Sequence, residues 1–221
     1  KPKKEEYSYS INEQTDILLE AIRRLQINSA HILSHDMGDT ISTELLTRQN
    51  LGLLPFFFKG GISFTFTNGG MRIELSKLRI GQYLLRIPIL GNIVSGLNNK
   101  KIFDINIKGI SGDKYEISEE HLNSLYEGNR HLNGNYRMVD TIKYLDERYR
   151  FQDTRWIPNL NEFARRNPKI PVNILWGDKD AVAPINIANR LWEDLKMLEN
   201  TKFLKMKHLG HFFMMENSQE F

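Results

Sequence analysis

The segment Ser34-His35-Asp36-Met37-Gly38 constrains the fold more than any other stretch of this sequence. It follows a short apolar run at residues 30–33 and precedes a helical pattern from Thr40 to Leu46. A carboxylate between a strand and a helix, with small residues two positions before and after it, is poorly explained by packing alone. The pattern predicts a sharp strand-to-helix turn with Asp36 at its apex.

Strand and helix signals alternate along much of the chain. Apolar residues at helical spacing predict helices at 11–26, 38–49 and 185–195. Ser10 and Glu13 fit a capping box at the start of the first of these. Short apolar or alternating runs predict strands at 30–34, 62–67, 172–176 and 203–206. This alternation implies an α/β fold with a mostly parallel sheet and helices on both faces.

Residues 72–168 have a different character. Helical patterns at 73–90, 118–127 and 139–148 are separated by Gly and Asn, and no parallel-sheet strand is evident between them. We therefore expect a core at residues 1–71, an inserted helical cap at 72–168, and a return to the core at 169–221.

Composition excludes several classes of protein. The 221 residues contain no cysteine, which rules out disulfides, thiolate catalysis and cysteine-ligated metals. A formal charge of +3 gives no indication of nucleic-acid binding, and no apolar run reaches the ~18 residues of a membrane helix. His208 and His211 lack a third ligand at suitable spacing, and no glycine-rich phosphate loop is present, so we expect neither a metal nor another cofactor.

The turn has the residue pattern of a nucleophile elbow. Such a turn needs small residues two positions on either side of the nucleophile, and Ser34 and Gly38 meet this need for Asp36. Ser34 itself is out of register, because Ile32 and Asp36 flank it. The amide of Met37 would point to the reacting group as an oxyanion donor. From these residues alone, an aspartate that caps the helix is an equal alternative.

The C-terminal part supplies possible partners for Asp36. Strand 172–176 is followed by Asp180, and strand 203–206 by His211. Loops after parallel strands meet at one edge of the sheet, so nucleophile, acid and histidine follow in the order Asp36, Asp180, His211. Asp178 is the alternative acid and His208 the alternative base.

The elbow, the Gly177-x-x-Asp180-x-x-x-Pro184 stretch and Gly210-His211-Phe212 resemble the α/β-hydrolase superfamily, in particular its aspartate-nucleophile branch of epoxide hydrolases and haloalkane dehalogenases. The resemblance implies that Asp36 attacks an electrophilic carbon of a small hydrophobic substrate and forms an ester. His211, supported by Asp180, would then activate water. Substrate contacts are expected from His35 and from the cap residues Tyr144 and Trp156, with Tyr83 as a second cap tyrosine.

Some residues depart from this branch. Dehalogenases usually have Trp after the nucleophile, whereas Met37 offers no side-chain donor, which favours epoxides over halides. Asp39, an unusual neighbour, is expected to cap its helix. Haloalkane dehalogenase or esterase activity, and a non-catalytic binding role, remain alternatives.

The elbow lies early in the chain compared with the superfamily. Strands are expected to be missing before it, so a second copy or a complementary chain would cover the free sheet edge. We expect a cytoplasmic protein that acts on a small molecule.

Overall fold

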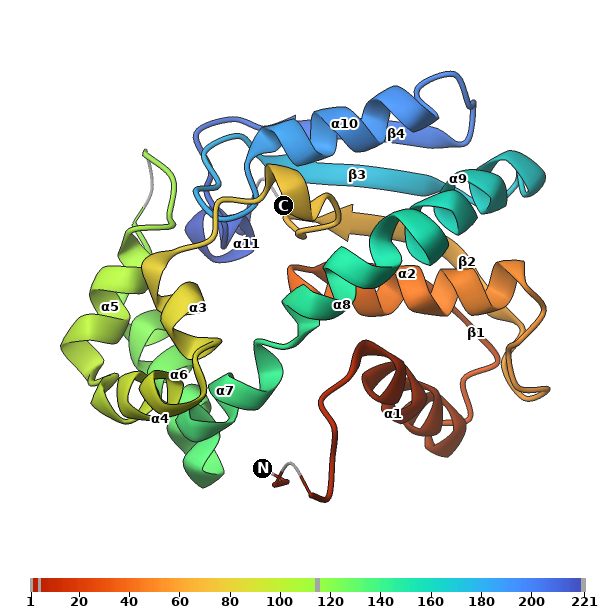
Figure 1. Ribbon diagram of the computed structural model, residues 1–221. Helices are drawn as coiled ribbons and strands as arrows, with labels where there is room; N and C mark the ends of the chain where they lie inside the picture. The colour runs from red at the N-terminus through yellow and green to blue at the C-terminus, as the bar shows by residue number, and fades with distance from the viewer. Residues whose placement is uncertain (1, 4, 114–115, 220–221) are drawn as a thin grey trace.

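Four parallel strands form one sheet within the described part of the computed structural model, which comprises residues 2–3, 5–113 and 116–219 (Figure 1). In spatial order the strands are β1 (Ser29–His35), β2 (Gly60–Thr67), β3 (Val172–Gly177) and β4 (Thr201–Met206). Each predicted strand is confirmed to within three residues. Because all four run in the same direction, their carboxyl ends meet at one edge.

One face of the sheet is covered by long helices. These are α2 (Met37–Asn50), α9 (Ile157–Arg166) and α10 (Ile185–Leu195), with α1 (Ile11–Arg24) packed on α2 (Figure 1). Their apolar side chains enclose a core that includes Phe64 and Trp176. The predicted helices at 11–26, 38–49 and 185–195 are confirmed.

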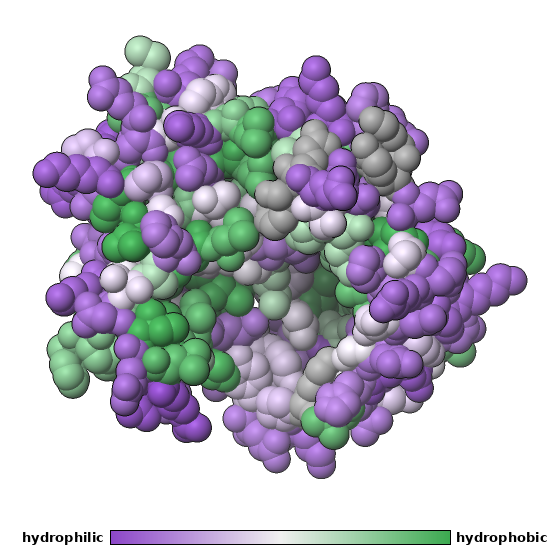
Figure 2. Space-filling view, turned by 180° about the vertical axis from the view of Figure 1, so that it is seen from behind, coloured by the Kyte–Doolittle hydropathy of each residue, from purple (hydrophilic) through white to green (hydrophobic). Residues whose placement is uncertain are grey.

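The other face of the sheet is much more open. Leu33 and Leu204 on this face are 58% and 59% exposed. The short helix α11 (Phe213–Glu216) packs near Leu175 at the carboxyl edge. Seen from behind, hydrophobic side chains gather on the surface in several patches (Figure 2).

The start of α1 shows how the expected cap is built. The Ser10 side chain accepts a hydrogen bond from the Glu13 amide at 3.2 Å. The Glu13 carboxylate accepts from the Ser8 amide at 2.6 Å rather than from Ser10. The Glu13 side chain therefore bonds to the backbone two residues before the N-cap residue instead of to the N-cap itself. The helix still begins where the sequence predicts.

The insert consists of short helical segments in its described residues. These are η1 (Ile73–Leu75), α3 (Ile80–Leu85), α4 (Pro88–Leu97), α5 (Lys100–Lys108), α6 (Glu119–Arg130), η2 (His131–Arg137), α7 (Met138–Thr141), α8 (Tyr144–Phe151) and η3 (Gln152–Trp156). A single helix at 73–90 is wrong: Arg79 is extended, and proline at position 88 begins a new helix. The predicted helix at 139–148 is likewise divided between α7 and α8.

Helix α9, the last helix of the range expected for the insert, packs against the sheet. Helix α9 falls inside the range 72–168, yet its Leu160, Phe163 and Ala164 are buried in the sheet core beside Phe64. The chain thus returns to the core through α8, η3 and α9 (Figure 1). No helix in the described ranges combines the length and apolarity that crossing a bilayer requires.

Candidate active site

The turn after β1 has the backbone geometry of a nucleophile elbow. Asp36 has φ +52° and ψ −115°, a conformation that costs energy for a residue with a Cβ. Its amide donates to the Thr67 carbonyl at 3.1 Å, which holds the turn against β2. A Cβ added to Gly38 would lie 3.7 Å from the Ser34 Cβ, so both small residues stand where the turn brings the backbone together. The local geometry fits Asp36 at the apex of an elbow and not an ordinary helix cap, because its side chain makes no capping hydrogen bond.

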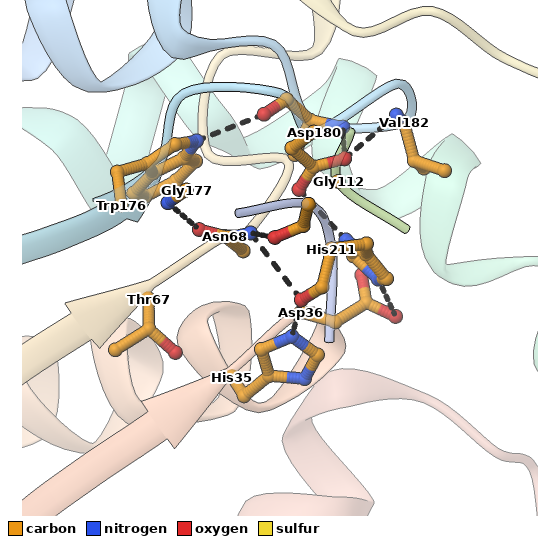
Figure 3. Close-up of polar contacts among 12 residues, drawn as sticks. His35, Asp36, Thr67, Asn68, Gly112, Trp176, Gly177, Asp180, Val182 and His211 are labelled. Carbon is orange, nitrogen blue, oxygen red and sulfur yellow. Dashed lines mark hydrogen bonds and ion pairs between the residues drawn. The ribbon is translucent and has the colours of Figure 1, made fainter. Parts of the chain in front are cut away.

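The three residues expected to act together lie in a chain of contacts (Figure 3). Asp180 Oδ2 lies 2.7 Å from His211 Nδ1, and His211 Nε2 lies 3.9 Å from Asp36 Oδ2. The other Asp180 oxygen accepts from the amides of Val182 and Ala183 at 2.7 and 2.9 Å. These amides fix the carboxylate, which in turn orients the imidazole so that Nε2 faces the elbow.

Burial and charge act in opposite directions on His211. Burial favours the neutral imidazole, but the carboxylates of Asp180 and Asp36 outweigh it and raise the pKa of His211 to about 10. Burial likewise favours a protonated Asp36, yet the hydrogen bond and charge of His211 hold the pKa of that carboxyl well below its usual range. The site therefore holds an ionised Asp36 beside a protonated His211.

The alternative acid and base lie together outside this chain of contacts. Asp178 Oδ1 accepts from the His208 amide at 2.8 Å. The imidazole of His208 is 55% exposed and lies 3.1 Å from Asp113, which also pairs with Lys179. Geometry thus favours Asp180 and His211 over Asp178 and His208.

Met37 borders the space in front of the elbow. It is the first residue of α2, where the helix has no internal acceptor for the backbone amide. Its side chain lines a cavity of about 460 Å³ together with Tyr144, Gln82 and Met138. Asp36 and His211 do not line this cavity, which adjoins the elbow through Met37 and Tyr144.

The residues expected to contact substrate differ in their placement. Tyr144 is 8% exposed, its hydroxyl accepts from Gln82 Nε2 at 3.4 Å, and burial followed by the Asp36 charge raises its pKa to about 12. His35 Nε2 lies 2.8 Å from the His211 carbonyl. The indole N–H of Trp156 donates to buried Glu44 at 2.8 Å and is not free to bind a leaving group. Tyr83 is 55% exposed.

Arg148 is a residue of the site that the sequence did not single out. Its side chain is almost fully buried and stacks on the Tyr144 ring, with the guanidinium carbon 4.5 Å from the ring centroid. Nε donates to the Thr40 hydroxyl at 2.9 Å and Nη2 to the Asp36 carbonyl at 3.3 Å. Its spacing of four residues from Tyr144 on a helix was the available signal.

Asp39 does not cap α2 through its side chain, contrary to expectation. Its Oδ1 accepts from the Ser34 hydroxyl at 2.6 Å and from the Thr67 amide at 3.1 Å. Complete burial, only partly offset by these bonds, raises its pKa well above the usual range. Asp39 thus ties the ends of β1 and β2 beneath the elbow.

Several known proteins are similar to this chain, although no family model matches it. A Mycobacterium tuberculosis protein named "Putative hydrolase LipZ" is 29% identical over 210 residues, which span 95% of this chain and 68% of that protein. The Bos taurus "Mesoderm-specific transcript homolog protein" is also 29% identical, over 97% of this chain and 62% of its own length. This chain therefore spans about two thirds of these relatives.

A solved structure shares the same architecture. Haloalkane dehalogenase DbeA from Bradyrhizobium elkani superimposes with a TM-score of 0.68 at 18% sequence identity, covering 98% of this chain and 70% of DbeA. At this identity the match concerns the arrangement of strands and helices and not the reaction. The described residues contain no group of three or more His, Cys, Asp or Glu side chains that could hold a metal ion.

Proposed function

The chain has the α/β-hydrolase fold, and from this premise we propose that it is a hydrolase with an aspartate nucleophile that opens epoxides of small hydrophobic compounds. The observation that carries the proposal is the position of the Asp36 carboxylate, at the apex of a strained elbow and 3.9 Å from His211 Nε2. A serine at the apex would indicate ester hydrolysis, whereas a carboxylate there suits attack on an electrophilic carbon of an epoxide or an alkyl halide.

The first step converts the Asp36 carboxylate into a neutral ester. One Asp36 oxygen forms a bond to an epoxide carbon, and the ring C–O bond breaks. The ring oxygen takes a proton from the Tyr144 hydroxyl, which borders the same cavity as Met37. The product of this step is a hydroxyalkyl ester of Asp36.

The second step needs a base, which ester formation itself supplies. In the free enzyme, two carboxylates keep His211 protonated. The ester is neutral, so one of these charges disappears and the pKa of His211 falls. A larger fraction of His211 can then give up its Nε2 proton, which restores the Tyr144 hydroxyl through solvent. Neutral His211 then takes a proton from water, whose oxygen adds to the ester carbonyl carbon. The Met37 amide stabilises the resulting oxyanion. The bond between the carbonyl carbon and the alkoxide oxygen then breaks, and the alkoxide takes the proton that His211 accepted from water, which releases the diol. The Asp36 carboxyl finally gives its proton to His211, which restores the starting charges.

The surroundings support epoxides over alkyl halides. A halide ion leaving from the substrate needs N–H donors that face it, but Met37 has no side-chain donor and the Trp156 N–H is taken by Glu44. An epoxide oxygen instead needs a proton, which Tyr144 can give. Haloalkane dehalogenation is the second candidate, because displacement of a halide by the Asp36 carboxylate would form the same kind of ester.

Mass spectrometry in H2¹⁸O tests the ester directly. During turnover of styrene oxide, attack of labelled water on the ester carbonyl should place ¹⁸O in the Asp36 carboxylate. His211→Gln should accumulate the hydroxyalkyl adduct on the peptide that contains Asp36, whereas His208→Gln should behave like the unaltered protein. Diol formation without label in Asp36 would refute the covalent mechanism. Bromide release from 1-bromobutane, without epoxide turnover, would favour the second candidate.

A further inference from the structure

Asn68 lies at the end of β2, where three loops of the site meet (Figure 3). Its side chain is completely buried, and every polar group on it is used. Oδ1 accepts from the Gly177 amide at 2.9 Å, and Nδ2 donates to the carbonyls of Gly210 and His211 at 2.9 and 3.3 Å. One amide thus contacts the loop that carries Asp180 and the loop that carries His211.

These contacts continue the sheet beyond its last backbone pairs. Strand pairing ends at Thr67 and Leu175 on one side of β3, and at Gly177 and Met206 on the other. β2 and β4 are not neighbours, because β3 lies between them. The Asn68 side chain nevertheless reaches past the end of β3 to the loop that follows β4, so it links segments that no strand pairing joins.

The backbone of His211 is held from several sides, and Asn68 is one of them. The His211 carbonyl is also 2.8 Å from His35 Nε2, and the His211 amide donates to the Ile110 carbonyl at 2.8 Å. The loop has no room to shift toward its neighbours, since a Cβ on Gly177 would lie 2.4 Å from the Gly210 carbonyl oxygen. A displacement of His211 would therefore have to break the bonds from Asn68.

We propose that Asn68 is a positioning residue, which fixes the distance between the loops of Asp180 and His211 and thereby aims the His211 imidazole at Asp36. This role rests on the function proposed above for Asp36 and His211. Asn68 touches neither substrate nor the reacting atoms. Its backbone φ of +51° is a conformation that Asn tolerates better than most residues with a Cβ, so the position suits an asparagine side chain.

The decisive variant is Asn68→Gly, which removes all three side-chain bonds and accepts the positive φ without strain. Asn200→Ala is the matched control. The Asn200 side chain likewise donates to three backbone carbonyls, those of Ala164, Asn167 and Ile170, but it lies just before β4, at the opposite end of that strand from His211. A purely structural role for Asn68 predicts similar behaviour of the two variants.

NMR of histidine-labelled protein reports on the His211 ring without any substrate. The downfield resonance of the proton between His211 Nδ1 and Asp180 is assigned with His211→Gln. In Asn68→Gly we expect this resonance to broaden or disappear and the titration midpoint of His211 to fall by at least one pH unit. Asn200→Ala should leave both unchanged. Unaltered His211 signals in Asn68→Gly, or equal changes in the two variants, would overturn the proposal.

Kinetics provide a second readout that separates this proposal from the proposed function. If styrene oxide is turned over, Asn68→Gly should lower kcat about 10- to 100-fold with KM within about twofold, as expected for a misplaced group. If the unaltered protein has no such turnover, the proposed function fails, and the NMR result alone decides on Asn68. Should Asn68→Gly not fold, Asn68→Asp keeps the size and the acceptor for Gly177. It offers at most one proton to two carbonyls, so it should change the same signals less, and unaltered signals would refute the role.

Discussion

The charge of Asp36 should account for a measurable part of the high pKa of His211. Asp36→Asn keeps the size of the side chain and removes its charge, while Asp180 remains bonded to Nδ1 at 2.7 Å. We expect the pKa of His211 to fall from about 10 in the unaltered protein, but to stay above the ordinary histidine value because of Asp180.

The size of the fall follows from the distance. Two unit charges 3.9 Å apart interact by about 4 kcal/mol at an effective dielectric constant of about 20. The Asp36 side chain is 41% exposed, so solvent screening reduces this to about 2 kcal/mol. At 1.36 kcal/mol per pKa unit, this corresponds to about 1.5 units. The His211 midpoint in Asp36→Asn should therefore lie at about 8.5.

Titration of the imidazole carbons and nitrogens by NMR measures this directly. His211→Gln assigns the signal among the six histidines. Asp113→Asn serves as a control, because it removes an exposed carboxylate that pairs with Lys179 and His208 rather than with His211. A His211 midpoint that moves by less than about 0.3 units in Asp36→Asn, or one already near the ordinary value of about 6.5 in the unaltered protein, would refute the charge coupling on which the second catalytic step depends.

Four further outcomes follow from the same contacts. The folded state raises the pKa of His211, so it binds more protons than the unfolded chain between about pH 6.5 and 10. The free energy of unfolding, measured by urea denaturation, should therefore decrease as pH rises through this window. The decrease should be smaller in His211→Gln. Glu44→Gln should lower the free energy of unfolding by about 2–4 kcal/mol in the same assay, because Glu44 is a buried partner of two arginines and an indole. Glu193→Gln, at an exposed position, should change it little. Ser34→Ala should retain epoxide turnover, and a serine-reactive phosphonate should not inhibit the protein; inhibition would favour an esterase. Tyr144→Phe should lower the rate of ester formation about 10²-fold or more in stopped-flow experiments without changing the His211 titration.

The parts of the site that depend on local sequence could be predicted. A strand, a turn with small residues at fixed spacing and a helix are encoded within about fifteen residues, and these determine the elbow at Asp36. Asp180 and His211 follow their own strands, so parallel pairing is enough to bring them to the same edge. Asp180 and His211 indeed lie 2.7 Å apart, and His211 and Asp36 lie 3.9 Å apart.

The parts that depend on contacts between distant segments could not. Arg148 reaches the Asp36 carbonyl across 112 positions of sequence, and Asn68 reaches His211 across 143. The spacing of Arg148 from Tyr144 indicates a shared helix face but not the contact with Asp36, and the turn signal at Asn68 does not indicate contacts with the loops of Asp180 and His211. Asp39 was misread for a related reason: its neighbours suggest a helix cap, but the acceptor it provides is used by Ser34 and by the adjacent strand. The helices of the insert were misplaced because helical periodicity does not show where one short helix ends and the next begins.

In the mechanism that we propose, the charges around the elbow let one site serve two successive steps. In the free protein, the carboxylates of Asp36 and Asp180 face two cations, His211 and Arg148, while burial raises the pKa of Asp39. Ester formation removes the Asp36 charge and leaves two cations against one carboxylate. Release of the His211 proton, which the lower pKa makes easier, restores the balance. Cleavage of the ester expels the alkoxide of the diol, and Arg148 and the reprotonated His211 stabilise the regenerated Asp36 carboxylate. The pairing that keeps the nucleophile an anion therefore also lowers the fraction of neutral His211 until the ester has formed.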